Sequence, residues 1–213
     1  MTDYSLHLNK VTMIFGRRLI FEEIDKSLKS GVIYGLAGSN GSGKSTLSKI
    51  MCGLLTPTKG KIVHHLNGKE IKEEKVQDYI GFVSPYLILY DEFTAWENLF
   101  HFSKIRGMNF DENFAKELMD SFGIYDRRND YFKGYSSGMK QRMKFIFALL
   151  HNPAFLMFDE PTSNLDNAGK EKVYEIIKKY GKDKLVVIAS NEDTDLAQCD
   201  EIIQVEDYKR KPN

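Results

Sequence analysis

A glycine-rich segment between an apolar run and a helix-forming run constrains this chain more than any other feature. It fits the pattern G-x-x-x-x-G-K-[ST], and its residues are Gly38, Ser39, Asn40, Gly41, Ser42, Gly43, Lys44, Ser45 and Thr46. Residues 32–37 before it are typical of a buried strand, and residues 46–52 can form a helix. In that setting glycines let backbone N–H groups face phosphate oxygens, and the helix N-terminus adds its positive dipole end. The segment therefore predicts a site for a nucleoside triphosphate, with Lys44 at the β- and γ-phosphates and Ser45 on Mg²⁺.

Two adjacent acidic residues end a second apolar run. The run covers residues 154–158 and is followed by Asp159 and Glu160. We expect this strand to lie beside the phosphate-loop strand, so that Asp159 holds Mg²⁺ through water. Glu160, one residue further, is then placed to orient or deprotonate an attacking water. The alternative is that the two acids only cap a strand, and the phosphate loop upstream favours the metal-binding and catalytic interpretation.

The order of strands and helices predicts the fold class. Residues 4–83 alternate short strand-like runs with turns, residues 94–150 are mainly helical, and the alternating pattern then returns. Thr94 followed by Glu97 is typical of a helix N-terminus, and Asp111 begins a second helix. Continuous apolar strands separated by helices indicate an α/β fold with a mostly parallel sheet, covered on both faces and interrupted by a helical insertion.

Composition excludes several function classes. The 213 residues carry 30 basic and 30 acidic side chains, so no net field attracts nucleic acid, and we expect no nucleic-acid partner. The basic tail at residues 209–211 is interpreted as a solvated terminus. Cys52 and Cys199 are too few for a disulfide framework or a metal site, which fits thiols in the cytosol. We recognise no signal peptide, and no apolar run approaches the roughly 20 residues that span a bilayer.

Further motifs resemble those of the ATP-binding-cassette (ABC) ATPase family over nearly the whole chain. Residues 155–160 resemble its Walker B strand, residues 161–166 its D-loop, residues 135–142 its signature segment and residues 94–99 its T-x-x-E-N-L helix. The order of these motifs matches that family and no other phosphate-loop family.

The resemblance implies a P-loop NTPase (RecA-like) fold. Its mostly parallel sheet core would carry an N-terminal antiparallel β subdomain and an inserted α-helical subdomain. Residues 1–213 would form a single nucleotide-binding domain. Residues 1–86 and 152–213 would make the ATP-binding core with the β subdomain, and residues 87–151 the helical subdomain with the signature segment.

The resemblance also implies a site shared between two subunits. In the family, two cassettes pair head to tail around two ATP–Mg²⁺, and each signature faces the other's phosphate loop. Ser136, Ser137 and Gly138 would then meet a γ-phosphate at the N-terminus of a helix, which we expect from Lys140 onward. Phe15 matches the aromatic residue that stacks on adenine. The implied partners are a second nucleotide-binding subunit, in a homo- or heterodimer, and an integral membrane permease subunit. That permease would hold the chain, itself cytoplasmic, on the cytoplasmic face of the cell membrane.

Two departures from the family's pattern concern the γ-phosphate. In the signature, Ser137 and Met139 replace a glycine and a glutamine, but the serine and second glycine remain, so we expect the anion site to survive. Asn191 stands at the switch-histidine position. An amide can donate a hydrogen bond to phosphate but cannot carry a proton or a positive charge near neutral pH. We therefore expect retained ATP binding and dimer closure, with Glu160 still supporting hydrolysis that is slower than in a histidine-bearing cassette.

A third departure concerns the metal. Pro85 stands where the family has its Q-loop glutamine, and proline offers no side-chain oxygen to Mg²⁺ or water. Either Ser84, Tyr86 or a water takes that place, or the contact is lost.

The sequence leaves three functions open. The favoured one is the ATP-hydrolysing subunit of an ABC transporter, driving a separate membrane subunit. The second is an ABC ATPase that acts on ribosomes, DNA ends or iron–sulfur assembly. The third is a low-activity regulatory cassette that binds ATP in a heterodimer, which Pro85 and Asn191 make worth testing.

Overall fold

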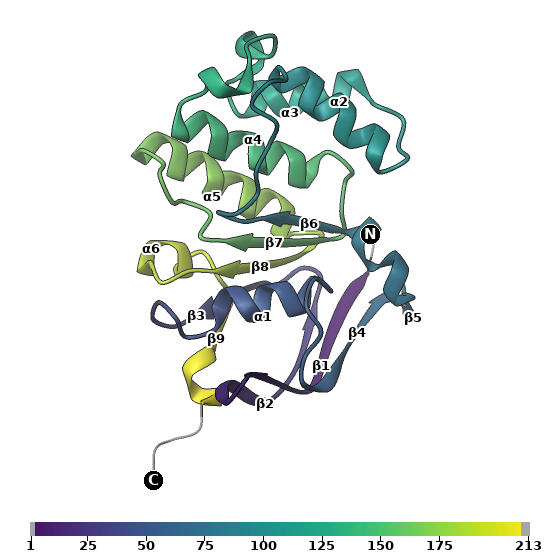
Figure 1. Cartoon of the computed structure of the whole chain (residues 1–213), viewed down its shortest axis with the longest axis vertical. Coiled ribbons are helices and arrows are strands. Elements are labelled where there is room, and N and C mark those ends of the chain that lie inside the picture. The colour runs from purple at the N-terminus through teal and green to yellow at the C-terminus, as the bar shows by residue number, and fades with distance from the viewer. Residues whose placement is uncertain (1–2, 210–213) are drawn as a thin grey trace.

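The computed structural model describes residues 3–209, so Arg210 and Lys211 of the basic tail lie outside the described residues. Within residues 3–209 the strands form two sheets, one of five strands and one of four (Figure 1). Helices pack on both faces of the five-stranded sheet, and the four-stranded sheet lies beside it. The expected α/β fold with an additional antiparallel β unit and a helical insertion is confirmed.

The five-stranded sheet is parallel throughout. Its strands, in spatial order, are β6 (Ile80–Val83), β7 (Phe155–Asp159), β8 (Leu185–Ala189), β3 (Ile33–Ala37) and β9 (Glu201–Gln204). Strand β7, which ends in Asp159, was expected to lie beside the phosphate-loop strand β3. This expectation is wrong, because β8 lies between them. All five residues of β8 are buried, as suits a central strand, and its apolar run could not be distinguished from that of β7 by composition.

The four-stranded sheet is antiparallel, in the order β2 (Arg18–Lys29), β1 (Tyr4–Phe15), β4 (Lys59–Leu66) and β5 (Lys69–Glu70). Where short strand-like runs separated by turns were expected, residues 4–15 form the single strand β1. Its pairing is irregular between Leu8 and Val11, and Lys10 adopts a φ of +50° there. Strand β2 was not expected, because its buried residues are spaced irregularly among charged ones.

The helices begin and end at recognisable caps. They are α1 (Lys44–Met51), α2 (Ala95–Ile105), α3 (Glu112–Ser121), α4 (Ser137–Leu149), α5 (Asn167–Gly181) and α6 (Asp193–Leu196), with short 3₁₀ turns η1 (Glu73–Tyr79), η2 (Tyr125–Arg127), η3 (Phe132–Gly134) and η4 (Val205–Tyr208). Thr94 and Glu97 form the expected capping box of α2, and Asp111 caps α3. Helix α4 begins at Ser137, earlier than the expected Lys140, because the Ser136 hydroxyl accepts from the Met139 N–H as a cap.

Two hydrophobic cores sandwich the parallel sheet. Alternate residues of β7 point to opposite faces: Leu156 and Phe158 meet α2–α5, whereas Phe155 and Met157 meet α1 and the antiparallel sheet. This double burial fixes the carboxyl ends of β3, β7 and β8 at one edge, where the candidate site lies. None of the helices among residues 3–209 is long and apolar enough to cross a bilayer.

Candidate nucleotide-binding site

The phosphate loop, residues 38–46, connects the carboxyl end of β3 to the N-terminus of α1. Gly41 and Gly43 have φ values of +77° and +113°, a region in which side chains are strained. A Cβ on Gly43 would also lie 2.7 Å from Ile20 Cγ2, so β2 packs directly beneath the loop. Ser39, Asn40 and Gly41 are exposed at its outer turn, and Thr46 is half-buried in α1. The loop is thus a concave turn whose interior lies at the helix N-terminus, as an anion site requires.

Lys44 folds its side chain back over this loop. Its Nζ donates to the carbonyl oxygens of Gly38, at 2.7 Å, and Ser39, at 3.1 Å. Burial lowers the pKa of the Lys44 amine below its ordinary value, and the nearby carboxylates of Glu160 and Asp159 oppose that shift. The ammonium group is therefore held at the loop by two neutral acceptors, which bound phosphate oxygens can replace.

Ser45 and Asp159 meet despite the intervening strand β8. Helix α1 packs over β7 and β8, and this brings the Ser45 hydroxyl 3.2 Å from Asp159 Oδ1, to which it donates. Asp159 is 1% exposed, and burial raises the pKa of its carboxyl above the ordinary value. Within the described residues, its Oδ2 and the buried Ser42 Oγ have no hydrogen-bond partner. A hydroxyl and a buried carboxylate with a free oxygen are a donor set that suits Mg²⁺, which prefers oxygen ligands.

Glu160 lies at a strained point directly after Asp159. Its φ is +50°, a value rare for a residue with a side chain, and its N–H donates to the Ala189 carbonyl at 2.8 Å. The backbone therefore turns sharply at the carboxyl end of β7, against the end of β8. This turn sends the chain away from the strand direction at the residue expected to act on water.

The signature segment lies apart from the phosphate loop in the same chain. Ser136 and Ser137 are exposed at the N-terminus of α4, and Gly138 is half-buried beside Asn164 and Leu165. No hydrogen bond or ion pair in residues 3–209 joins this segment to residues 38–46. The structure thus brings together Lys44, Ser45, Asp159 and Glu160 and leaves the signature segment facing outward.

Similarity to known proteins identifies the family of this chain. The family model described as "ABC transporter" matches residues 21–163. The chain belongs to the ABC transporter family of ATPases.

Curated relatives agree with this assignment, and a solved structure agrees with the fold. The cassette is 34% identical to the uncharacterized ABC transporter ATP-binding protein YdbJ of Bacillus subtilis, over 85% of this chain and 59% of that one. It is 33% identical to the linearmycin resistance ATP-binding protein LnrL of the same organism, over 86% of this chain and 60% of that one. The chain therefore spans about three fifths of the length of these relatives. A putative ABC transporter ATP-binding protein from Pyrococcus furiosus has the same fold, with a TM-score of 0.83, 24% identity and coverage of 97% and 100%.

The remaining expected residues of the ABC cassette, Asn191 and Phe15, are both exposed. Asn191 is exposed directly after β8, next to Ser190, whose N–H donates to the Leu36 carbonyl at 3.2 Å. Phe15 is 49% exposed at the end of β1, before the tight turn at Gly16. An exposed aromatic face at this position is free to stack on a flat ligand.

A buried carboxylate that the sequence analysis missed joins the loop after β7 to the loop after β8. Asp195 is 1% exposed in α6 and accepts from three hydroxyls: Thr162 at 2.9 Å, Tyr174 at 2.9 Å and Ser190 at 2.7 Å. Thr162 follows Glu160 in the D-loop, and Ser190 precedes Asn191. No signal in the sequence distinguishes Asp195 from the acidic residues around it.

A second missed residue touches the phosphate loop itself. Glu206, in η4, accepts from both the N–H and the hydroxyl of Ser39, at 3.2 and 2.5 Å. These two hydrogen bonds lower the pKa of the Glu206 carboxyl. The last described turn of the chain thus fixes the entrance of the loop, an arrangement that 167 residues of separation hide from sequence patterns.

A third residue that the sequence analysis missed, Lys144, lies at the Q-loop position. Pro85 is exposed, and Ser84 is buried with its hydroxyl accepting from the Tyr86 N–H at 3.3 Å. Tyr86 is 73% exposed, and its ring lies 5.3 Å from the ammonium nitrogen of Lys49 in α1. Neither side chain makes a polar contact with Ser45 or Asp159 among the described residues. Instead, Lys144 of α4 donates to the carbonyl oxygens of Ser84 and Pro85.

Proposed function

We propose that this cassette hydrolyses ATP with Mg²⁺ and drives a separate membrane-spanning permease subunit. The observation that carries the proposal is the Ser45–Asp159 contact, at 3.2 Å, with the unpartnered Asp159 Oδ2 beside it. A buried carboxylate whose pKa is raised by desolvation is stabilised when a cation binds next to it. Ser45 and Asp159 would together hold a divalent cation, which would supply positive charge to a bound triphosphate.

The roles of the residues follow from their positions. Lys44 exchanges its two carbonyl acceptors for phosphate oxygens, and Ser45 and Asp159 hold Mg²⁺. When bound, the metal neutralises charge on the β- and γ-phosphate oxygens. Glu160 accepts the proton of the attacking water, and Asn191 donates a hydrogen bond to the γ-phosphate.

A single chain does not complete the site. Phe15 stacks on adenine from one side, and a second cassette supplies Ser136, Ser137 and Gly138 to the γ-phosphate, with the two subunits packed head to tail. The outward position of that segment at the N-terminus of α4 supports this pairing, because a helix N-terminus is attractive to an anion. In this proposal residues 87–151 act as the helical subdomain and the remaining residues as the ATP-binding core. Through its permease, the cassette sits on the cytoplasmic face of the membrane.

Glu160→Gln tests the proposal. We expect ATP affinity within about threefold of the parent and phosphate release reduced at least about a hundredfold, since the general base is lost. The slowed variant is also expected to form an ATP-dependent dimer in size-exclusion chromatography with Mg²⁺. Glu171→Gln, an exposed acid in α5, is the matched control. Unchanged phosphate release in Glu160→Gln contradicts the catalytic assignment.

A pull-down from detergent-solubilised membranes tests the permease partner. An integral membrane protein in the complex supports transport, whereas ribosomal or DNA-associated proteins favour the non-transport alternative. A third result separates the regulatory alternative, which Pro85 and Asn191 favour: a wild-type chain that binds ATP but releases no phosphate is a regulatory cassette of a heterodimer.

A further inference from the structure

The loop between β6 and α2, residues 84–94, presents an exposed surface close to the site. Tyr86, Ile88 and Tyr90 are 73%, 88% and 64% exposed, whereas Leu89 between them is buried. This alternation turns three large side chains outward and uses one to anchor the loop in the core. Apart from Leu89, the loop is held in this shape by hydrogen bonds to its backbone.

Lys144 of the signature helix α4 holds the beginning of the loop. Its Nζ donates to the Ser84 carbonyl at 3.1 Å and to the Pro85 carbonyl at 2.8 Å. The Ser84 carbonyl also accepts from the Leu87 N–H at 3.1 Å, so one turn of the loop is gathered around this ammonium group. The Lys144 amine is partly withdrawn from water, and this burial lowers its pKa.

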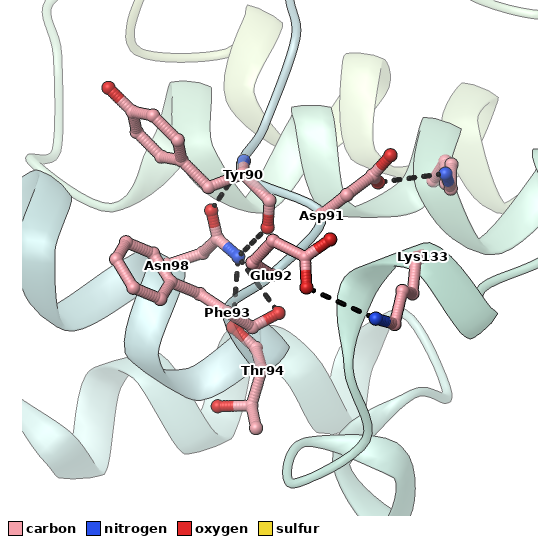
Figure 2. Close-up of polar contacts among 8 residues, drawn as sticks. Tyr90, Asp91, Glu92, Phe93, Thr94, Asn98 and Lys133 are labelled. Atoms are coloured by element: carbon pink, nitrogen blue, oxygen red, sulfur yellow. Dashed lines mark hydrogen bonds and ion pairs between the residues drawn. The ribbon is translucent and has the colours of Figure 1, made fainter.

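Asn98 of α2 holds the end of the loop, as Figure 2 shows. Its Oδ1 accepts from the Tyr90 N–H at 3.0 Å, and its Nδ2 donates to the carbonyls of Tyr90 and Thr94, both at 2.9 Å. Asn98 is 2% exposed, so these hydrogen bonds are shielded from water. The end of the loop is thus fixed to the N-terminus of α2, independently of Lys144.

Two ion pairs add to the link with the signature region. Lys140 of α4 pairs with Asp91 at 3.1 Å. Lys133 pairs with Glu92, also at 3.1 Å (Figure 2). These pairs are substantially exposed, so each contributes little to stability. Lys140 and Lys144 are four residues apart and lie on the same face of α4, which is the face toward the loop.

An open groove of about 280 Å³ lies between the loop and α4, and its lining includes Leu87, Ile88, Ser137, Lys140 and Lys144. The two lysine side chains reach the loop along this groove, beside the buried Leu89, which packs in the same hydrophobic core as α4.

We infer that Lys144 is a positioning residue that ties the β6–α2 loop to the signature segment. The loop is thus attached to α4 through its backbone, whereas the Pro85 side chain offers no oxygen that could attach it to the metal. Ser137 and Lys144 lie on one continuous helix, seven residues or about 10 Å apart, so a displacement of its N-terminus is carried to the lysine. Binding of a γ-phosphate at that N-terminus thus moves the carbonyls of Ser84 and Pro85 and, with them, the exposed surface at Tyr86 and Ile88. The inference rests on the proposed function, because it takes ATP as the ligand that moves α4.

Hydrogen exchange of single amides in the full chain tests this link. The comparison uses Lys144→Met, which keeps an unbranched side chain without a donor, and Lys178→Met on the exposed face of α5 as the control. Without nucleotide, we expect the Tyr86 and Leu87 amides to exchange about tenfold faster in Lys144→Met. The Tyr90 amide, held by Asn98, is expected to change less than twofold and serves as the internal reference.

Exchange measured with bound nucleotide then distinguishes a positioning role of Lys144 from a purely stabilising one. In the Glu160→Gln background, Mg·ATP is expected to change the exchange of Tyr86 and Leu87 at least threefold. Lys144→Met should abolish that response while ATP affinity stays within twofold, and Lys144→Arg should restore it. Lys144→Leu, which also lacks a donor, replaces Lys144→Met if the latter does not fold. Unchanged exchange, or a retained ATP response in the variant lacking the donor, overturns the inference. If the parent chain binds no ATP, the proposed function fails instead, and the nucleotide-free comparison still decides whether Lys144 holds the loop.

Discussion

Asp195 offers the sharpest test of how the two loops of the site are held together. It accepts hydrogen bonds from Thr162, Tyr174 and Ser190 while being 1% exposed, and three hydroxyl donors suit an ionised carboxylate. Asp195→Ala deprives Thr162 and Tyr174, both buried, of their acceptor. Ser190 Oγ keeps one bond, because it also accepts from the Glu192 N–H at 3.0 Å.

The expected loss in free energy of unfolding follows from the number of hydrogen bonds removed. A hydrogen bond to a charged acceptor contributes about 1.5–3 kcal/mol, so losing two in full gives roughly 3–6 kcal/mol for Asp195→Ala. For a chain of this length that lowers the Tm by roughly 6–24 °C. Asp195→Asn keeps an oxygen for Thr162 and Tyr174, and its amide can donate to Ser190, so we expect a loss of only about 1 kcal/mol.

The functional effect distinguishes a tie between catalytic loops from a stabilising contact. Thr162 fixes the chain after Glu160, and Ser190 fixes the chain before Asn191, so loss of Asp195 displaces both. A displacement of about 1 Å can reduce turnover about a hundredfold. We therefore expect kcat of Asp195→Ala to fall between about ten- and a hundredfold, with ATP affinity within threefold, when measured 20 °C below the variant's own Tm.

The assay is phosphate release under saturating Mg·ATP, beside thermal unfolding of the same samples. Asp193→Asn, exposed in the same short helix, is the control and should stay within about 0.5 kcal/mol of the parent. The reasoning is refuted if Asp195→Ala is destabilised as expected but keeps its kcat within twofold, because the network then stabilises the fold without positioning the site.

Two further predictions concern protons. Asn191→His is expected to raise the rate of phosphate release on the order of tenfold, since histidine can hold a positive charge or pass a proton where asparagine cannot, and no gain over the parent contradicts the role given to Asn191. His64 is buried with its Nδ1 2.8 Å from the Tyr4 hydroxyl, and burial lowers its pKa to about 4, whereas the unfolded chain binds the same proton near pH 6.5. Its contribution to stability is therefore complete above pH 6.5 and is lost as the pH falls toward 4, by about 3 kcal/mol, which urea unfolding at pH 7 and 4.5 measures. His64→Gln should flatten that part of the pH dependence, and an equally steep fall in the variant assigns it to other groups.

The predicted phosphate site rests on local signals, because its residues are contiguous. The glycines, Lys44 and Ser45 lie within nine positions, and their geometry depends on backbone conformations that glycine makes accessible. Helix caps at Thr94 and Asp111 were predictable for the same reason, since each cap involves residues three positions apart. By contrast, the place of β8 between β3 and β7 depends on a choice among equally apolar strands, which no local pattern encodes.

The residues that the sequence analysis missed share one property: each acts on a main-chain or side-chain group far along the chain. Glu206 reaches Ser39, Asp195 reaches Thr162, and Lys144 reaches Pro85, over separations of 167, 33 and 59 residues. None belongs to a motif, because a carboxylate or an ammonium group that orients a loop can come from any element that passes nearby. Such residues become visible only once the fold places them.

The two altered positions of this cassette differ in what the structure provides around them. At Pro85 the backbone carbonyl accepts from Lys144, so the loop has an attachment although proline offers no side-chain oxygen. At Asn191 the preceding residue is tied to Asp195, so the loop is held although asparagine cannot carry a proton. In both places the backbone is held and the chemistry of one side chain is reduced. An ABC cassette built this way should bind ATP and change shape with it while turning over slowly. The ratio of ATP affinity to phosphate release rate, rather than either alone, is therefore the quantity that characterises it.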